Sequence, residues 1–233
     1  MTYSPAQAGV MTGEDYFTSL GILGASTGMS PIISANKTIP AVDAYSSQLT
    51  VAVTDSVLKY TQTTTSSNRQ CSWNLGATKT KLLAISYFNI GTSYDSQGIF
   101  LSQDTWSGSQ STQAYLDNAY YFINYPYASN NKVGMLKVVS SSHAWLTSGT
   151  DATICVNDDA FAHSYGLAFY CEDHVQKAWV KMGSTSQWVQ ILSLTDESLD
   201  IAGTPFESVG IHTGYSSGNI GRVISPFYVW GAA

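Results

Sequence analysis

The chain has 233 residues and a formal net charge of −6, and only 11% of its side chains are charged, against roughly 25% in an average soluble domain. Its 10 lysines and arginines are scattered. Binding to a nucleic-acid backbone requires clustered basic side chains, so the composition excludes a nucleic-acid partner. No stretch approaches 18 consecutive apolar residues, so we expect no spanning helix and no membrane insertion.

Residues 1–48 differ from the remainder of the chain because they are rich in Gly, Ala, Ser and Pro and show no sustained alternation. Short helices are expected at Gly13–Leu20, where Thr12 could cap the first turn, and at Ala41–Ser47. The first residues contain neither basic side chains nor an apolar run, so no signal peptide is expected. A segment of this kind buries little core alone. We therefore interpret residues 1–48 as an anchoring and assembly arm that other chains order; the alternative is a first strand plus loops of the same domain.

Residues 49–233 are dominated by short runs in which apolar and polar residues alternate, the pattern of half-buried β-strands. Loops rich in Gly, Ser, Asn and Asp separate these runs, an arrangement typical of an all-β sandwich or barrel. The expected strands are Leu49–Tyr60, Gln70–Leu75, Thr80–Ile90, Gly98–Ser102, Ala119–Asn124, Lys132–Val139, Thr153–Val156, Ser164–Cys171, Gln176–Met182, Gln187–Leu194, Ser208–Thr213 and Val223–Trp230.

The phase of the alternation predicts which side chains face the core. In Gln176–Met182 it places Lys177, Trp179 and Lys181 outside. Leu82–Ile90 is apolar on both faces and should be a central strand, whereas Pro226 should place the last strand at an edge or at a bulge. The predicted core contains Leu167, Phe169, Val180, Ile191, Val209 and Ile211.

The cysteines and histidines show no spacing that would hold zinc, and we expect no metal and no cofactor. Cys171 closes an alternating strand and should be a buried hydrophobe, with a disulfide to Cys155 as the alternative. Because Cys71 makes the count odd, at least one cysteine is free or paired between chains. His143, His163, His174 and His212 lie in four separate elements.

Aromatic side chains are abundant, with 6 Trp and 15 Tyr, and many fall within residues 106–145. Tyr and Trp combine a flat apolar face with a polar tip, which suits stacking on sugar rings and packing at wet interfaces. Four of these residues are the candidate ligand-binding residues for a glycan or a protein: Trp106, Tyr125, Tyr127 and Trp145. No catalytic residue is expected.

From about Gly98 to Gly231 the order of motifs resembles the concanavalin A-like jelly roll of lectin and laminin-G type domains. QGIFLSQ, AYYFINY and KVGMLKVV are similar to the middle strands of that family. SYGLAFYCEDHVQKAWVKMGSTSQWVQILSL, ESVGIHTGYSSGN and VISPFYVWG resemble its later strands. The resemblance implies an all-β fold of two antiparallel sheets. It also implies a role in binding glycans or proteins, often as a module of bacteriophage structural proteins.

The sequence departs from the enzymes and metal-dependent lectins of that family. Its hydrolases carry carboxylates at alternate positions of one strand, which share a face. Here the closest acidic pairs are adjacent: Asp158–Asp159, Glu172–Asp173 and Asp196–Glu197. Asn157–His163 is a faint echo of a calcium loop, and turn chemistry explains its composition better.

These observations predict a non-enzymatic virion structural protein: a bacteriophage capsid-decoration, head-fibre or tail/adhesin component. Its expected partners are copies of itself, other virion proteins and host-surface glycan, and its expected location is the extracellular particle. The alternatives are a secreted or free carbohydrate-binding module and, third, a polysaccharide-degrading enzyme of the same fold.

Overall fold

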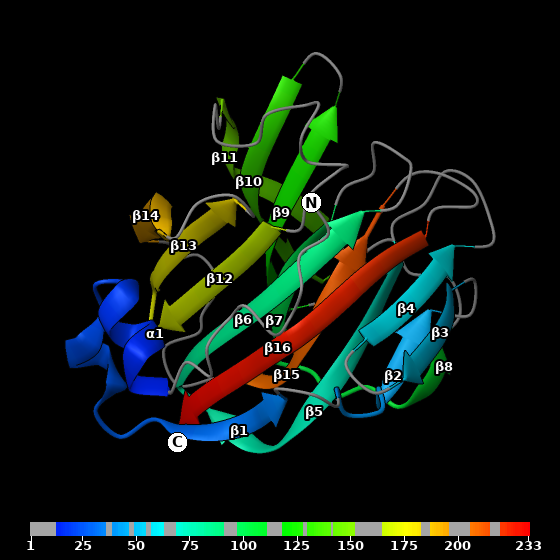
Figure 1. The fold of residues 1–233 in the computed structure, drawn as a ribbon, viewed down its shortest axis with the longest axis horizontal. Coiled ribbons are helices and arrows are strands. Elements are labelled where there is room, and N and C mark those ends of the chain that lie inside the picture. Colours follow the sequence, from blue (N-terminus) through cyan, green and yellow to red (C-terminus); the bar gives the residue numbers. More distant parts are fainter. Residues whose placement is uncertain are drawn as a thin grey trace.

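The computed structural model describes residues 13–35, 39–46, 49–54, 57–62, 69–90, 97–110, 118–127, 130–140, 142–151, 165–182, 187–195, 206–214 and 220–233. Two eight-stranded sheets, A and B, pack face to face, and among the described strands every pairing is antiparallel except one (Figure 1). The predicted two-sheet antiparallel jelly-roll sandwich is therefore confirmed. Among the described helices, none is long and apolar enough to span a membrane.

Sheet A forms one layer of the sandwich. Its strands lie in the order β14 (Val189–Thr195), β13 (Val175–Met182), β12 (Tyr165–Glu172), β6 (Lys81–Ile90), β16 (Ile220–Ala232), β4 (Val57–Gln62) and β3 (Leu49–Thr54), and β1 (Ser30–Ala35) also pairs with β16.

Sheet B forms the opposite layer. Its order is β11 (Ser142–Asp151), β10 (Asn130–Val139), β9 (Ala119–Tyr127), β7 (Gln97–Ser102), β15 (Phe206–Thr213), β5 (Arg69–Lys79), β2 (Ala44–Ser46) and β8 (Gly108–Gln110), with β2 and β8 parallel. The predicted run Thr153–Val156 lies outside the described residues.

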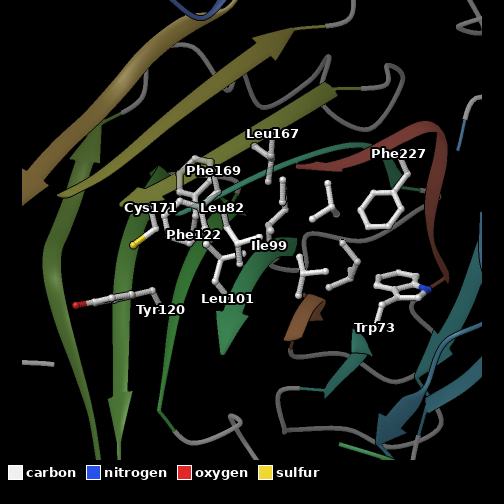
Figure 2. Close-up of a cluster of buried hydrophobic side chains, with 14 of the residues drawn as sticks. Trp73, Leu82, Ile99, Leu101, Tyr120, Phe122, Leu167, Phe169, Cys171 and Phe227 are labelled. Carbon is white, nitrogen blue, oxygen red and sulfur yellow. The ribbon is translucent and has the colours of Figure 1, made fainter. Parts of the chain in front are cut away.

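The main core lies between the two sheets, where alternate side chains of both layers meet. In Figure 2, Leu167 and Phe169 of β12 point toward Ile99 and Phe122 of sheet B. Five of the predicted core residues are fully or almost fully buried here, and the sixth, Ile191, packs against them half-buried. The predicted register is therefore confirmed.

A second core covers the outer face of sheet A, and the N-terminal segment builds it. This segment contains helix α1 (Gly13–Ser19) and the 3₁₀ helix η2 (Leu23–Ser26). Tyr16 and Phe17 are buried, and their rings lie 5.9 and 5.6 Å from the ring of Trp230. Trp179, predicted to face outward, does leave the main core, but it is buried in this second cluster rather than exposed.

The described part of residues 1–48 thus packs on its own sandwich. Strand β1 pairs with the C-terminal half of β16, and β2 pairs with β5 and β8. The alternative of a first strand plus loops of the same domain therefore describes these residues, and the anchoring and assembly role of residues 1–48 stays a prediction. The helix predicted at Ala41–Ser47 is also wrong, because Ala44–Ser46 is strand β2.

The last strand is central rather than an edge, because β6 lies on one side of it and β4 and β1 lie on the other. Its register to β6 shifts between Ile224 and Tyr228, around Pro226. Proline has no N–H to donate to a ladder, so a bulge lets it sit inside a sheet. The predicted bulge is confirmed and the edge position is not.

Candidate functional site

The outer face of sheet B carries a row of side chains that crosses six neighbouring strands. The register places Trp145, Leu136, Tyr121, Phe100, Gly210 and Ser72 opposite one another from β11 to β5. Their sequence neighbours, such as Phe122 and Cys71, lie in the main core. Because strand side chains alternate between faces, the row itself points away from that core.

A parallel row on the same face adds polar groups beside the aromatic ones. Gly134, Ile123, Gly98, His212 and Gln70 lie opposite one another along it. One half of the face, on β7, β9 and β10, is apolar and forms a compact cluster that includes Phe100 and Tyr121. The other half, on β15 and β5, is polar. Phe100, Tyr121, Gln70 and His212 are all buried, so among the residues of these two rows Trp145, at 41% exposed, is the one that a ligand can reach directly.

Tyr121 joins the two halves. Its ring stacks on Phe100 at 4.9 Å and meets His212 edge-on at 5.6 Å, and its hydroxyl donates to Gln70 Oε1 over 3.0 Å. The arrangement depends on Gly210, because a Cβ there would lie 2.1 Å from the ring of Phe100. Glycine at this position leaves the space that the aromatic rings occupy.

His212 is uncharged in this setting. Its side chain is fully buried, and burial lowers its pKa to about 3, because the imidazolium form loses its hydration. A neutral imidazole beside the Tyr121 ring keeps the centre of the face free of formal charge.

Residues 103–107, which we call the strap, cross the same face between β7 and β8. The Ser208 hydroxyl donates to the Asp104 carbonyl over 2.7 Å. The Asn74 side chain binds Trp106 twice, accepting from its N–H at 3.2 Å and donating to its carbonyl at 2.8 Å. Trp106 is thereby held by its backbone while its half-buried ring packs against the apolar cluster of sheet B.

Two of the four predicted site residues lie on this face. Trp145 is 41% exposed, and its ring lies so close over Gly134 that a Cβ there would be 2.5 Å from it. Trp106 reaches the same face from the strap. Tyr125 and Tyr127 lie in β9, paired with Lys132 and Asn130, but their side chains are outside the described part.

Sequence reasoning missed Phe100, Gln70 and Asn74. A signal existed for the last two, because they alternate with the buried residues Cys71 and Trp73. No local feature of the sequence, however, indicates that the Gln70 side chain bonds to Tyr121. Gln70 is in β5 and Tyr121 is in β9, and β15 and β7 lie between these two strands.

The acidic pair that the structure describes serves a turn rather than a groove. Glu172 accepts from Tyr170 and forms an ion pair with Lys81 at 2.7 Å. Burial raises the pKa of Glu172, but the bonds from Lys81 and Tyr170 outweigh it and hold that pKa below its usual value. Asp173 has a positive φ of 50° in the turn before β13. Asp158–Asp159, Asp196–Glu197 and Asn157–His163 lie outside the described residues.

The cysteines that the structure describes are structural. Cys71 and Cys171 are both buried and free, which confirms the interpretation of Cys171 as a buried hydrophobe. Burial raises the pKa of the Cys71 thiol to about 12, so it remains protonated and unreactive. Cys155 lies outside the described part. Within that part, no three His, Cys, Asp or Glu side chains gather as metal ligands.

No protein-family model and no curated protein matches the sequence. Solved structures do match it. The exoplasmic/lumenal domain of VIP36 in its Ca²⁺-bound form has a TM-score of 0.54 at 10% identity, with 89% of this chain and 93% of that chain covered. The chain has the concanavalin A-like jelly-roll fold.

Two further structures share this concanavalin A-like architecture. A functionally unknown protein from Saccharomyces cerevisiae has a TM-score of 0.51 at 10% identity, covering 80% of this chain and 98% of that one. Xylan β-1,4-xylosidase from Bacillus halodurans C-125 has a TM-score of 0.51 at 8% identity. That match covers 75% of this chain but only 32% of the xylosidase. At these identities the likeness establishes the fold alone.

Proposed function

We propose that this chain is a non-enzymatic glycan-binding domain and that the outer face of sheet B is its binding surface. The observation that carries the proposal is the exposed ring of Trp145, which continues the aromatic row formed by Tyr121 and Phe100. Sugar rings stack on flat aromatic faces while their hydroxyls bond to nearby polar groups. The fold supports the proposal, since the VIP36 domain of the same fold was solved in a form bound to Man3GlcNAc.

A glycan array followed by calorimetry tests this function. We expect the wild-type protein to bind at least one glycan class and Trp145→Ala to weaken that binding tenfold or more. The matched control is Tyr45→Ala, which also removes an exposed aromatic side chain. Tyr45 is paired with the core residue Cys71, so its strand position belongs to the other face of sheet B. Absence of glycan binding, or equal loss in both variants, would overturn the proposal. Parallel runs in calcium and in a chelator establish whether binding needs a cation.

The absence of catalysis is part of this proposal. Glu172 and Asp173 are adjacent and engaged in a turn, an arrangement that cannot place two carboxylates on either side of one glycosidic bond. Incubation with the glycan that binds, followed by assay of reducing ends, should release no sugar. Turnover that is lost on substitution of any acidic residue would contradict it.

We also propose, as the setting for this domain, a virion-associated structural protein that assembles with its own copies on a bacteriophage head or tail. The supporting observation is the low share of charged residues, 11%, because a neutral surface repels identical copies weakly. Mass measurement of the native assembly tests this setting. A monomer at all concentrations would contradict it while leaving glycan binding intact.

A further inference from the structure

The outer face of sheet A contains a tryptophan packed on a glycine, at the edge of the sheet. Trp188 immediately precedes β14, and its ring lies 2.7 Å from the position that a Cβ on Gly166 would take. The ring of Tyr87 meets that of Trp188 edge-on at 5.9 Å. Gly166 therefore serves as the floor of a small aromatic cluster on β12 and β6.

The same tryptophan carries a polar atom that has no partner among the described residues. Trp188 is 8% exposed, and its indole Nε1 is buried and donates to no acceptor in the part of the chain that the structure describes. A buried N–H that makes no hydrogen bond has lost its hydration without compensation, so buried donors normally have a partner.

A half-buried cation lies over the same ring. The Lys181 Nζ is 6.0 Å from the centroid of the Trp188 ring, and the side chain extends from the outward face of β13. Within the described residues Lys181 forms no ion pair or hydrogen bond. Burial lowers its pKa, since nothing there compensates its charge. Lys81, by contrast, has Glu172 at 2.7 Å.

A carboxylate is the ligand group that would satisfy both donors at once. It is acceptor-only, it can accept a charge-assisted bond from an ammonium, and its second oxygen remains for the indole N–H. A neutral hydroxyl could accept from the indole but would leave the cation uncompensated. We infer that Trp188 and Lys181 form a second binding site, for a saccharide that carries a carboxylate, such as a uronic or sialic acid.

This inference rests on the proposed function for the saccharide part of the ligand but not for its carboxylate. The site lies on sheet A, whereas the glycan surface proposed above lies on sheet B, so variants separate the two. The probes are glucuronate and, as a neutral match, glucose. Binding is measured by titration followed by ligand-observed nuclear magnetic resonance.

Lys181→Met removes the charge and retains an apolar stem over the ring, and Trp188→Phe removes the N–H. We expect saturable glucuronate binding to weaken tenfold or more in Lys181→Met and at least threefold in Trp188→Phe. Lys177→Met is the control on the same strand, because that ammonium contributes instead to the field around Glu172. Its glucuronate affinity should equal that of the wild type.

No saturable glucuronate binding, or an affinity unchanged in Lys181→Met, would overturn the inference. Glucuronate binding that Trp145→Ala abolishes and Lys181→Met does not would place the ligand on sheet B, which retains the proposed function and refutes this second site. Should Trp188→Phe fail to fold, Lys181→Met alone decides the question, because its side chain is only half-buried.

Discussion

At the scale of single residues, His212 makes the stability of the sandwich depend on pH. Its pKa in the folded state is about 3, below the ordinary value of 6.5, so the unfolded chain binds the additional proton between these limits. The stabilisation is complete above pH 6.5 and is lost as the pH falls toward 3. At about 1.4 kcal/mol per pKa unit, we expect a loss of about 2 kcal/mol between pH 7 and pH 5.

Urea unfolding of the wild type and of His212→Gln at several pH values measures this term. The variant has no imidazole to protonate, so its free energy of unfolding should fall less steeply over the same range. His143→Gln, at an exposed position on β11, is the matched control. Identical slopes in the wild type and His212→Gln would show that other groups cause the acid sensitivity.

Gly210 maintains the packing on the outer face of sheet B because it has no side chain. A Cβ there would lie 2.1 Å from the Phe100 ring and 2.5 Å from the backbone oxygen of Cys71. The ring can rotate, but the strand backbone cannot yield without disturbing the ladder. Gly210→Ala should therefore destabilise the protein by about 1–3 kcal/mol. Gly24→Ala, where nothing lies within 4 Å, should change the unfolding free energy by less than about 0.5 kcal/mol.

At the scale of elements, the strap depends on one amide side chain. Asn74 binds both backbone groups of Trp106, and its own N–H donates to Asp43 Oδ2 at 2.8 Å, which orients it. Asn74→Ala should raise hydrogen exchange in residues 103–107 and weaken glycan binding threefold or more without unfolding the sandwich. Asn74→Asp retains the acceptor and loses the donor, so its exchange rate and its glycan affinity should lie between those of the wild type and Asn74→Ala. Unchanged exchange in Asn74→Ala would show that the Trp106 ring alone fixes the strap.

The N-terminal segment should contribute strongly to folding. Phe17 is buried against Trp230, and Phe17→Ala should cost about 3–5 kcal/mol. Leu23→Ala, on the exposed η2, should cost less than about 0.5 kcal/mol. If Phe17→Ala and Leu23→Ala both changed the free energy of unfolding by equally small amounts, the segment would be only loosely attached to the sandwich. That result would favour the interpretation of the segment as an arm.

The sequence contained a clue to this second core. Leu82–Ile90 is apolar on both faces, which places it centrally, but an apolar outer face also requires a cover. The cover is formed by Tyr16 and Phe17, on a helix too short to suggest an amphipathic stripe, and by Leu20 directly after it. Strand phase is local and therefore predictable. The pairing of a seven-residue helix with residues 83 and 230 is not, because only the tertiary fold brings them together.

At the scale of the whole molecule, the fold was predictable because period-2 patterning extends over most of the chain and fixes which residues point inward. The site was predictable only in part. Trp106 and Trp145 could be recognised as aromatics near loops, yet the polar half of the same face comes from β5 and β15, far away in sequence. The jelly-roll topology places β5 and β15 in the same sheet as the strands near Trp106 and Trp145. No local pattern in the sequence of β5 or β15 indicates which strands they pair with.

The proposed assembly has an open edge at β14, where a large apolar side chain is exposed. This strand ends sheet A, carries no charged residue or proline, and exposes 43% of Val189. Edge strands without lysine or proline can pair with another chain. We expect the mass in sedimentation to rise with concentration for the wild type and less for Val189→Lys. Thr50→Lys places the same charge on the opposite edge strand, β3, and should behave as the wild type. Equal association of all three would exclude β14 as the contact, since an added charge on a paired edge must weaken it.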